Sequence, residues 1–74
     1  MKKREFVMEV FVLMGEIDYE GSDLLGVYAS EEEAITARNI YSRDLRYEVF
    51  DGYYIQRQVL GAPANPEFTD RRYV

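Results

Sequence analysis

The sequence reads FVMEVFVLM from Phe6 to Met14, and this stretch decides the fold. Successive side chains of a strand point to opposite faces of a sheet, so a strand here would carry large apolar side chains on both faces. One face would hold Phe6, Met8, Val10, Val12 and Met14, and the other Val7, Phe11 and Leu13. The rest of the chain has one strong helix signal, and a single helix buries only one face. We predict that a tail of the chain, a second copy or a foreign partner covers the second face, which we assign to Phe11 and Leu13, and that this face carries the function.

The composition excludes several classes of protein. A core built from 74 residues rarely supplies more than about 3–5 kcal/mol of net stability, so association is expected. The chain has no cysteine, which fits a reducing compartment such as the cytoplasm. Its net charge of −5 argues against direct nucleic-acid binding, because phosphates need a basic surface.

The basic start at residues 2–4 superficially resembles a signal peptide. However, Glu9 interrupts the apolar run that follows, and the run is far shorter than the ~20 residues of a membrane span. We therefore predict neither a targeting segment nor contact with a membrane.

Two strand-like runs flank a polar loop. Residues 15–23 are rich in glycine and carboxylates, and residues 24–29 read LLGVYA. This pattern predicts an antiparallel hairpin. Gly26 inside the second run indicates a β-bulge or a close backbone approach.

Residues 30–33, Ser-Glu-Glu-Glu, carry the clearest local signal. They form a capping box, in which the Ser30 hydroxyl accepts from the Glu33 amide and the Glu33 carboxylate accepts from the Ser30 amide. A helix should begin here, with Ala34, Ala37 and Tyr41 at helical spacing. It should fade at about residues 44–46.

Asp51-Gly52 stands between two β-prone runs, residues 47–50 and 53–60. The pair predicts a two-residue hairpin. Alternatively, residues 47–50 are only a connection and Gly52 opens the last strand. A right-handed crossover through the helix would place the last strand beside the first, giving the sheet order 2-1-3.

The predicted fold class is α+β. The order is β-β-α-(β)-β, with a mostly antiparallel sheet of three or four strands and one helix packed on one face. Residues 1–60 form this single domain. Residues 61–74, which begin Gly-Ala-Pro-Ala-Asn-Pro, form an extended C-terminal tail.

The residue inventory argues against an enzyme. The chain has no histidine and no cysteine, and no serine lies in a nucleophile elbow. We predict no catalytic residue, no cofactor and no metal ligand set. Calcium or magnesium at the carboxylates of residues 16–23 is a weaker hypothesis, because their spacing does not match the twelve-residue calcium loop.

The acidic residues of the loop and of the helix start could form one acidic face. Such a face would compete for a basic nucleic-acid-binding groove by presenting carboxylates where phosphates would lie. Helix capping and solubility are the simpler explanation. The residues are Asp18, Glu20, Asp23, Glu31, Glu32 and Glu33.

Tyrosines divide between the core and an expected interaction surface. Tyr28, Tyr41 and Tyr53 are in phase with core positions, whereas others are candidates for exposure, and tyrosine is enriched at interface hot spots. The predicted interaction residues are Phe11, Leu13, Tyr19, Tyr47 and Tyr54.

Three segments carry a resemblance to a known group of proteins: residues 10–13 (VFVL), the acidic loop 16–21 and residues 25–34 (LGVYASEEEA). They resemble small uncharacterised proteins of phages, prophages and their bacterial hosts, which share the pattern "G-V-Y-x-S-x-E-E-A". The resemblance covers about Val10 to Leu60, and those proteins carry no catalytic assignment that could be transferred to this chain. The chain lacks the tryptophan-containing ending of those proteins.

Two hypotheses of function follow. The first is a small cytoplasmic interaction module that forms a homodimer through a sheet face or a strand edge. The second is a phage-type acidic inhibitor that occludes a basic nucleic-acid-binding or defence complex.

Overall fold

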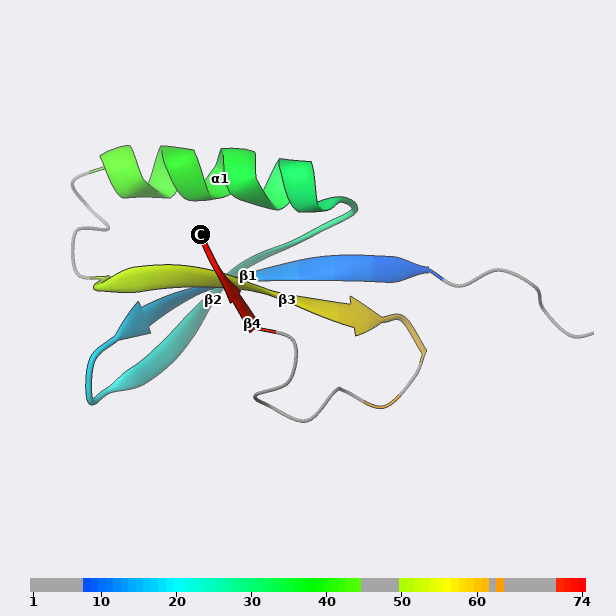
Figure 1. The fold of residues 1–74 in the computed structure, drawn as a ribbon, viewed down its shortest axis with the longest axis horizontal. Coiled ribbons are helices and arrows are strands. Elements are labelled where there is room, and N and C mark those ends of the chain that lie inside the picture. Colours follow the sequence, from blue (N-terminus) through cyan, green and yellow to red (C-terminus); the bar gives the residue numbers. More distant parts are fainter. Residues whose placement is uncertain (1–7, 45–49, 62, 64–70) are drawn as a thin grey trace, which may run out of the picture.

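A computed structural model describes residues 8–44, 50–61, 63 and 71–74, which form a sheet with one helix on it (Figure 1). In chain order the elements are β1 (Glu9–Ile17), β2 (Gly21–Tyr28), α1 (Glu31–Arg43), β3 (Gly52–Val59) and β4 (Arg71–Tyr73). Every pairing is antiparallel, and the strand order is β2-β1-β3-β4. The predicted α+β fold, with the first strand between the second and the third, is confirmed.

The β1–β2 hairpin contains the irregularity expected at Gly26. The register shifts between Leu13, which pairs with Gly26, and Met14, which pairs with Leu24. Gly26 has a φ of 153°, and a Cβ there would lie 2.7 Å from ring carbons of Tyr28. Both a β-bulge and a close approach therefore require glycine at this position.

The helix begins and ends where the sequence predicts. The Ser30 Oγ accepts from the Glu33 amide at 3.1 Å. The Glu33 carboxylate, however, accepts from the Ala29 amide at 3.2 Å and not from that of Ser30, so the reciprocal half of the capping box is shifted by one residue. At the other end, the Asp44 amide donates to the Tyr41 carbonyl at 3.1 Å.

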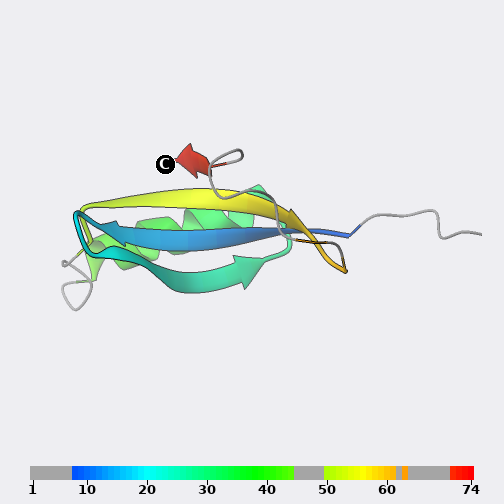
Figure 2. The same cartoon turned by 90° about the horizontal axis from the view of Figure 1, so that it is seen from below.

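The core lies between α1 and one face of the sheet, and the helix lies behind the sheet in Figure 2. The buried residues of the core are Leu13, Ala34, Tyr53 and Ile55. Leu13 pairs with Ile55, so both point to the same face, and the helix presents a small residue, Ala34, to them. The assignment of Phe11 and Leu13 to the uncovered face is therefore wrong, because Leu13 is 0% exposed and Phe11 packs against this core.

Glycine explains why the helix covers this face. A Cβ at Gly15 would lie 2.6 Å from the ring of Phe50, and Gly26 makes similar room for Tyr28. The rings of Phe50 and Tyr28 can therefore approach the strand backbone closely on this side of the sheet and add apolar surface to the core beneath the helix.

The start of β3 follows the alternative interpretation of Asp51-Gly52, in which Gly52 opens the last long strand. Asp51 joins this start to the β1–β2 turn. Its amide donates to the Glu16 carbonyl at 2.7 Å, and its carboxylate accepts from the Asp18 amide at 2.7 Å. Of the short strand predicted at residues 47–50, residues 47–49 lie outside the described residues.

Residues 71–73 form β4, so the prediction of an extended tail over residues 61–74 is corrected there by a short strand. Tyr73 pairs with Tyr54, and Arg71 with Gln56. Beyond the strand, the Val74 amide donates to the Tyr53 carbonyl at 3.1 Å. Three residues show too little alternation of apolar and polar side chains to identify a strand from sequence. The strand β4 depends instead on its contacts with β3.

Candidate interaction surface on the sheet

No described helix covers the face of the sheet opposite α1, which we call the helix-free face (Figure 2). Strand alternation and the register fix which side chains it carries, because directly paired residues point to the same side. Val12 pairs with Val27 of β2, and Met14 pairs with Leu24. These side chains, together with Val10 of β1, form what we call the aliphatic strip: Val10, Val12, Met14, Leu24 and Val27.

The strip is open to solvent along β2. Leu24 is 61% exposed and Val27 is 55% exposed, while Val12 and Met14 are half-buried beside them. Single exposed apolar residues are common on soluble proteins, but contiguous ones on neighbouring strands mark a surface that binds something. The strip is therefore the best candidate for an interaction surface on the sheet.

An aromatic cluster borders the strip on β3 and β4. Tyr54 is only 2% exposed although no described helix covers it, and the side chains of Tyr73 and Arg71 from the neighbouring strand β4 pack against its ring. The ring centroids of Tyr54 and Tyr73 are 5.3 Å apart, and the Arg71 guanidinium carbon lies 4.2 Å from the centre of the Tyr54 ring. The Tyr54 hydroxyl donates to the Ser22 Oγ at 3.1 Å, which connects the cluster to β2 across the width of the sheet.

Arg71 supplies the positive charge of this cluster. Its Nη1 donates to the Tyr73 hydroxyl at 3.5 Å and lies 3.9 Å from the Glu16 carboxylate. The hydrogen bond with Tyr73, aided by the rings and by Glu16, raises the pKa of Arg71 above its ordinary value although burial lowers it. The Arg71 guanidinium thus remains charged, and it forms a polar border beside the aliphatic strip on the helix-free face.

The structure separates the residues predicted as one interaction surface. Phe11 and Leu13 lie under the helix, whereas Tyr54 lies on the opposite face of the sheet. Tyr19 is fully exposed at the β1–β2 turn, and Tyr47 lies outside the described residues.

The aliphatic strip was missed, although the sequence contains a signal for it. Gly15 is in phase with Phe11 and Leu13, and a glycine within a strand indicates the side on which a ring or another backbone approaches closely. That side packs against the helix. The alternate residues, Val12 and Met14, therefore line the open side.

The predicted single acidic face is not formed. Asp18 and Glu20 lie at the β1–β2 turn, whereas Glu32 and Glu33 lie at the start of α1, beyond the far end of β2 (Figure 1). The eight residues of β2 separate the two groups by roughly 25 Å at about 3.3 Å per residue. Asp23 lies within β2 near the turn, and Glu31 forms an ion pair with Arg72.

The described residues show neither a grouped set of metal ligands nor a membrane-spanning helix. Within residues 8–44, 50–61, 63 and 71–74, no three acidic, histidine or cysteine side chains are grouped as a metal site would require. Over the same part of the chain, no helix combines the length and the apolar character needed to cross a membrane.

Comparison with known proteins identifies the family. Residues 8–57 match a family described as a domain of unknown function, DUF7336. The match includes β1, β2, α1 and most of β3, but not β4. Neither the curated proteins nor the solved structures contain a match. The predicted resemblance to an uncharacterised family is thus confirmed, and because the match covers more than half of the chain, the protein belongs to the DUF7336 family.

Proposed function

We propose that this protein is a small non-catalytic interaction module that forms a homodimer through its helix-free face. The exposure of Leu24 and Val27, at 61% and 55%, carries the proposal. A sheet with one helix packs only one of its faces, and covering the other gains about 25 cal/mol for each Å² of apolar surface buried.

The distribution of charge supports self-association through this face. An isologous dimer brings the same patch of two copies together, so the patch must not repel itself. The five residues of the aliphatic strip are all uncharged, although the chain carries a net charge of −5. The acidic groups at the turn and at the start of α1 lie at the ends of the sheet, where screening over about 8 Å weakens their repulsion.

The alternative function, an acidic inhibitor of a basic complex, has less support. Its carboxylates lie in two groups at opposite ends of β2 and do not make one phosphate-like surface. We place the homodimer in the cytoplasm, because a chain without cysteine gains nothing from an oxidising compartment. An origin in phages or prophages remains a prediction from the sequence resemblance.

Sedimentation velocity over a range of concentrations tests the dimer, with Leu24→Lys as the disrupting variant. Ile40→Lys is the matched control, because Ile40 on α1 is 60% exposed and Leu24 is 61% exposed. We expect wild type and Ile40→Lys to associate as concentration rises, while Leu24→Lys remains a monomer. A monomeric wild type at every concentration, or association of both variants like wild type, would contradict the proposal.

A further inference from the structure

The outer edge of β2 has no neighbour among the described residues, because β2 is the first strand in the sheet order. An edge strand presents unpaired N–H and C=O groups and can accept an extended chain as an additional strand. β2 has eight residues, whereas β4 at the other edge has three. β2 therefore offers the longer template for strand addition.

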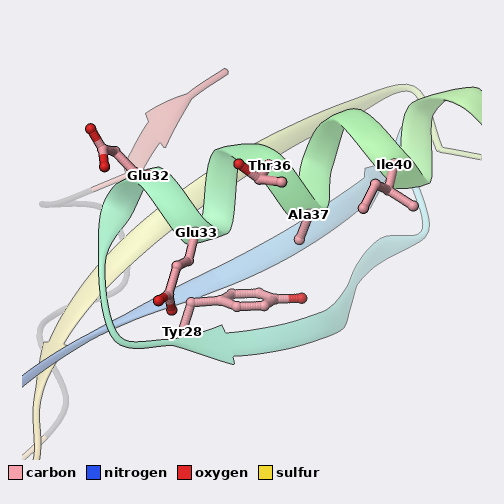
Figure 3. Close-up of a pocket in the computed structure, with 6 residues that line it drawn as sticks. All are labelled: Tyr28, Glu32, Glu33, Thr36, Ala37 and Ile40. Atoms are coloured by element: carbon pink, nitrogen blue, oxygen red, sulfur yellow. The ribbon is translucent and has the colours of Figure 1, made fainter.

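A groove of 590 Å³ lies between this edge and α1 (Figure 3). Tyr28 of β2 contributes one ring to it, and the remaining lining comes from one side of the helix. The lining residues are Tyr28, Glu32, Glu33, Thr36, Ala37 and Ile40. A strand added to β2 would direct alternate side chains into this groove.

The β2 side of the groove is held by internal hydrogen bonds. The Tyr28 hydroxyl donates to the Leu25 carbonyl at 3.5 Å, and the Tyr41 hydroxyl donates to the same carbonyl at 3.0 Å. Burial, together with the nearby Tyr41, raises the pKa of Tyr28, so this side of the groove is uncharged at neutral pH. The charged side chains that a ligand in the groove could contact therefore belong to α1.

The groove differs between its two ends. Glu32 and Glu33 lie in the first turn of α1, and Ile40 lies two turns further along. At 1.5 Å per residue, the acidic and apolar ends are about 11–12 Å apart. Strand residues four positions apart point the same way and are separated by about 13 Å, whereas residues two apart span only about 7 Å.

We propose that the β2 edge and this groove bind an extended segment of another protein, in which a lysine or arginine stands four positions from an aliphatic residue. The basic side chain pairs with Glu33, which points toward Tyr28 (Figure 3), and the aliphatic one packs on Ile40 and Ala37. The bulge beside Leu24 makes the edge irregular, which disfavours indiscriminate strand pairing and leaves selectivity to the groove. The proposal does not rest on the homodimer, because it uses the other side of β2.

Fluorescence polarisation with labelled peptides and the full chain tests the proposal. The first probe is a polythreonine nonapeptide with arginine and isoleucine four positions apart, and the second has the same composition with a spacing of three. We expect the second to bind about tenfold more weakly, because odd spacing places one anchor on the other face of the strand. Two further probes are versions of the first peptide with N-methyl groups on alternate residues, one version methylated on the odd-numbered residues and the other on the even-numbered ones. We expect only the version whose methylated amides would pair with β2 to lose binding.

Two variants with matched controls test the groove itself. Glu33→Gln removes the charge but retains the oxygen that accepts from the Ala29 amide, and Glu20→Gln removes the same charge at the distant turn. Ile40→Ala shortens a side chain that is 60% exposed, and Leu60→Ala shortens one that is 62% exposed. We expect the two groove variants to weaken the first probe about fivefold each, and the controls to change its affinity by less than twofold.

Two results would overturn the proposal. Equal affinity for both spacings, or full affinity in folded Glu33→Gln and Ile40→Ala variants, would show that the groove does not recognise the segment.

The chain's own residues 2–7 have Lys2 four positions from Phe6 and Lys3 four positions from Val7, so a second copy could supply the segment. In that case Lys2→Gln/Lys3→Gln would raise the affinity for the probe severalfold, whereas we expect no change.

Discussion

Leu13 and Val12 are neighbours on β1 that point to opposite faces of the sheet, and truncating each to alanine tests which face the helix covers. Leu13 is 0% exposed in the core, whereas Val12 is half-buried on the helix-free face. Leu13→Ala removes three buried carbon groups worth about 0.8 kcal/mol each, and the cavity left behind brings the loss to about 3–4 kcal/mol. Val12→Ala removes two partly buried groups and should cost about 1 kcal/mol or less.

The loss at Leu13 is most of the stability expected for a domain of this size, about 3–5 kcal/mol. Leu13→Ala should therefore be largely unfolded at 25 °C, and the milder Leu13→Val, which loses one carbon group, keeps the comparison measurable at about 1 kcal/mol. Urea denaturation followed by circular dichroism measures the free energy of unfolding. The protein concentration is kept where sedimentation shows a monomer, so that self-association does not bury Val12.

One result would refute the conclusion that the helix covers the Leu13 face. If Val12→Ala costs as much as Leu13→Ala, or more, the helix covers the Val12 face and the interaction surface lies on the other side of the sheet.

Three further predictions concern thermal stability and local opening of the fold. Gly15→Ala places a Cβ 2.6 Å from the Phe50 ring, so it should cost about 1–3 kcal/mol; an unchanged melting temperature would show that the ring is free to move. Arg71→Ala removes the cation 4.2 Å from the Tyr54 ring, so amides of β4 should exchange hydrogen severalfold faster, and wild-type exchange rates would contradict this role. The raised pKa of Tyr28 means that the native state retains a proton that the unfolded state loses above pH 10, so stability should fall as pH rises through that range. Tyr28→Phe should show a shallower loss of melting temperature between pH 9 and pH 11, and parallel curves would refute the assignment.

The elements that could be predicted from the sequence are those fixed by neighbouring residues. The capping box at Ser30 begins the helix, Gly26 marks the bulge, and alternation in β1 identifies a strand with two apolar faces. The crossover through one helix then places the third strand beside the first. Each of these depends on local chemistry or on a general rule of connection.

The remaining features depend on contacts between distant residues. Alternation shows that β1 has two apolar faces but not which one the helix selects, and that choice depends on Phe50 packing over Gly15. β4 depends on its pairing with β3 and on the contact of Tyr73 with Tyr54, nineteen positions earlier in the chain. The acidic residues were grouped by their order in the sequence, whereas a hairpin strand separates them in space.

The short last strand also limits how far such a sheet can grow. Residues 8–57, the family match, would form a three-stranded unit with β2 at one edge and β3 at the other. β4 covers part of β3, and among the described residues only β2 keeps a long free edge. Chains with two free edges can add to each other without end and form fibres, whereas chains with one can join only in pairs. β4 thus covers part of the second edge and shortens the template that another chain would need for continued strand addition.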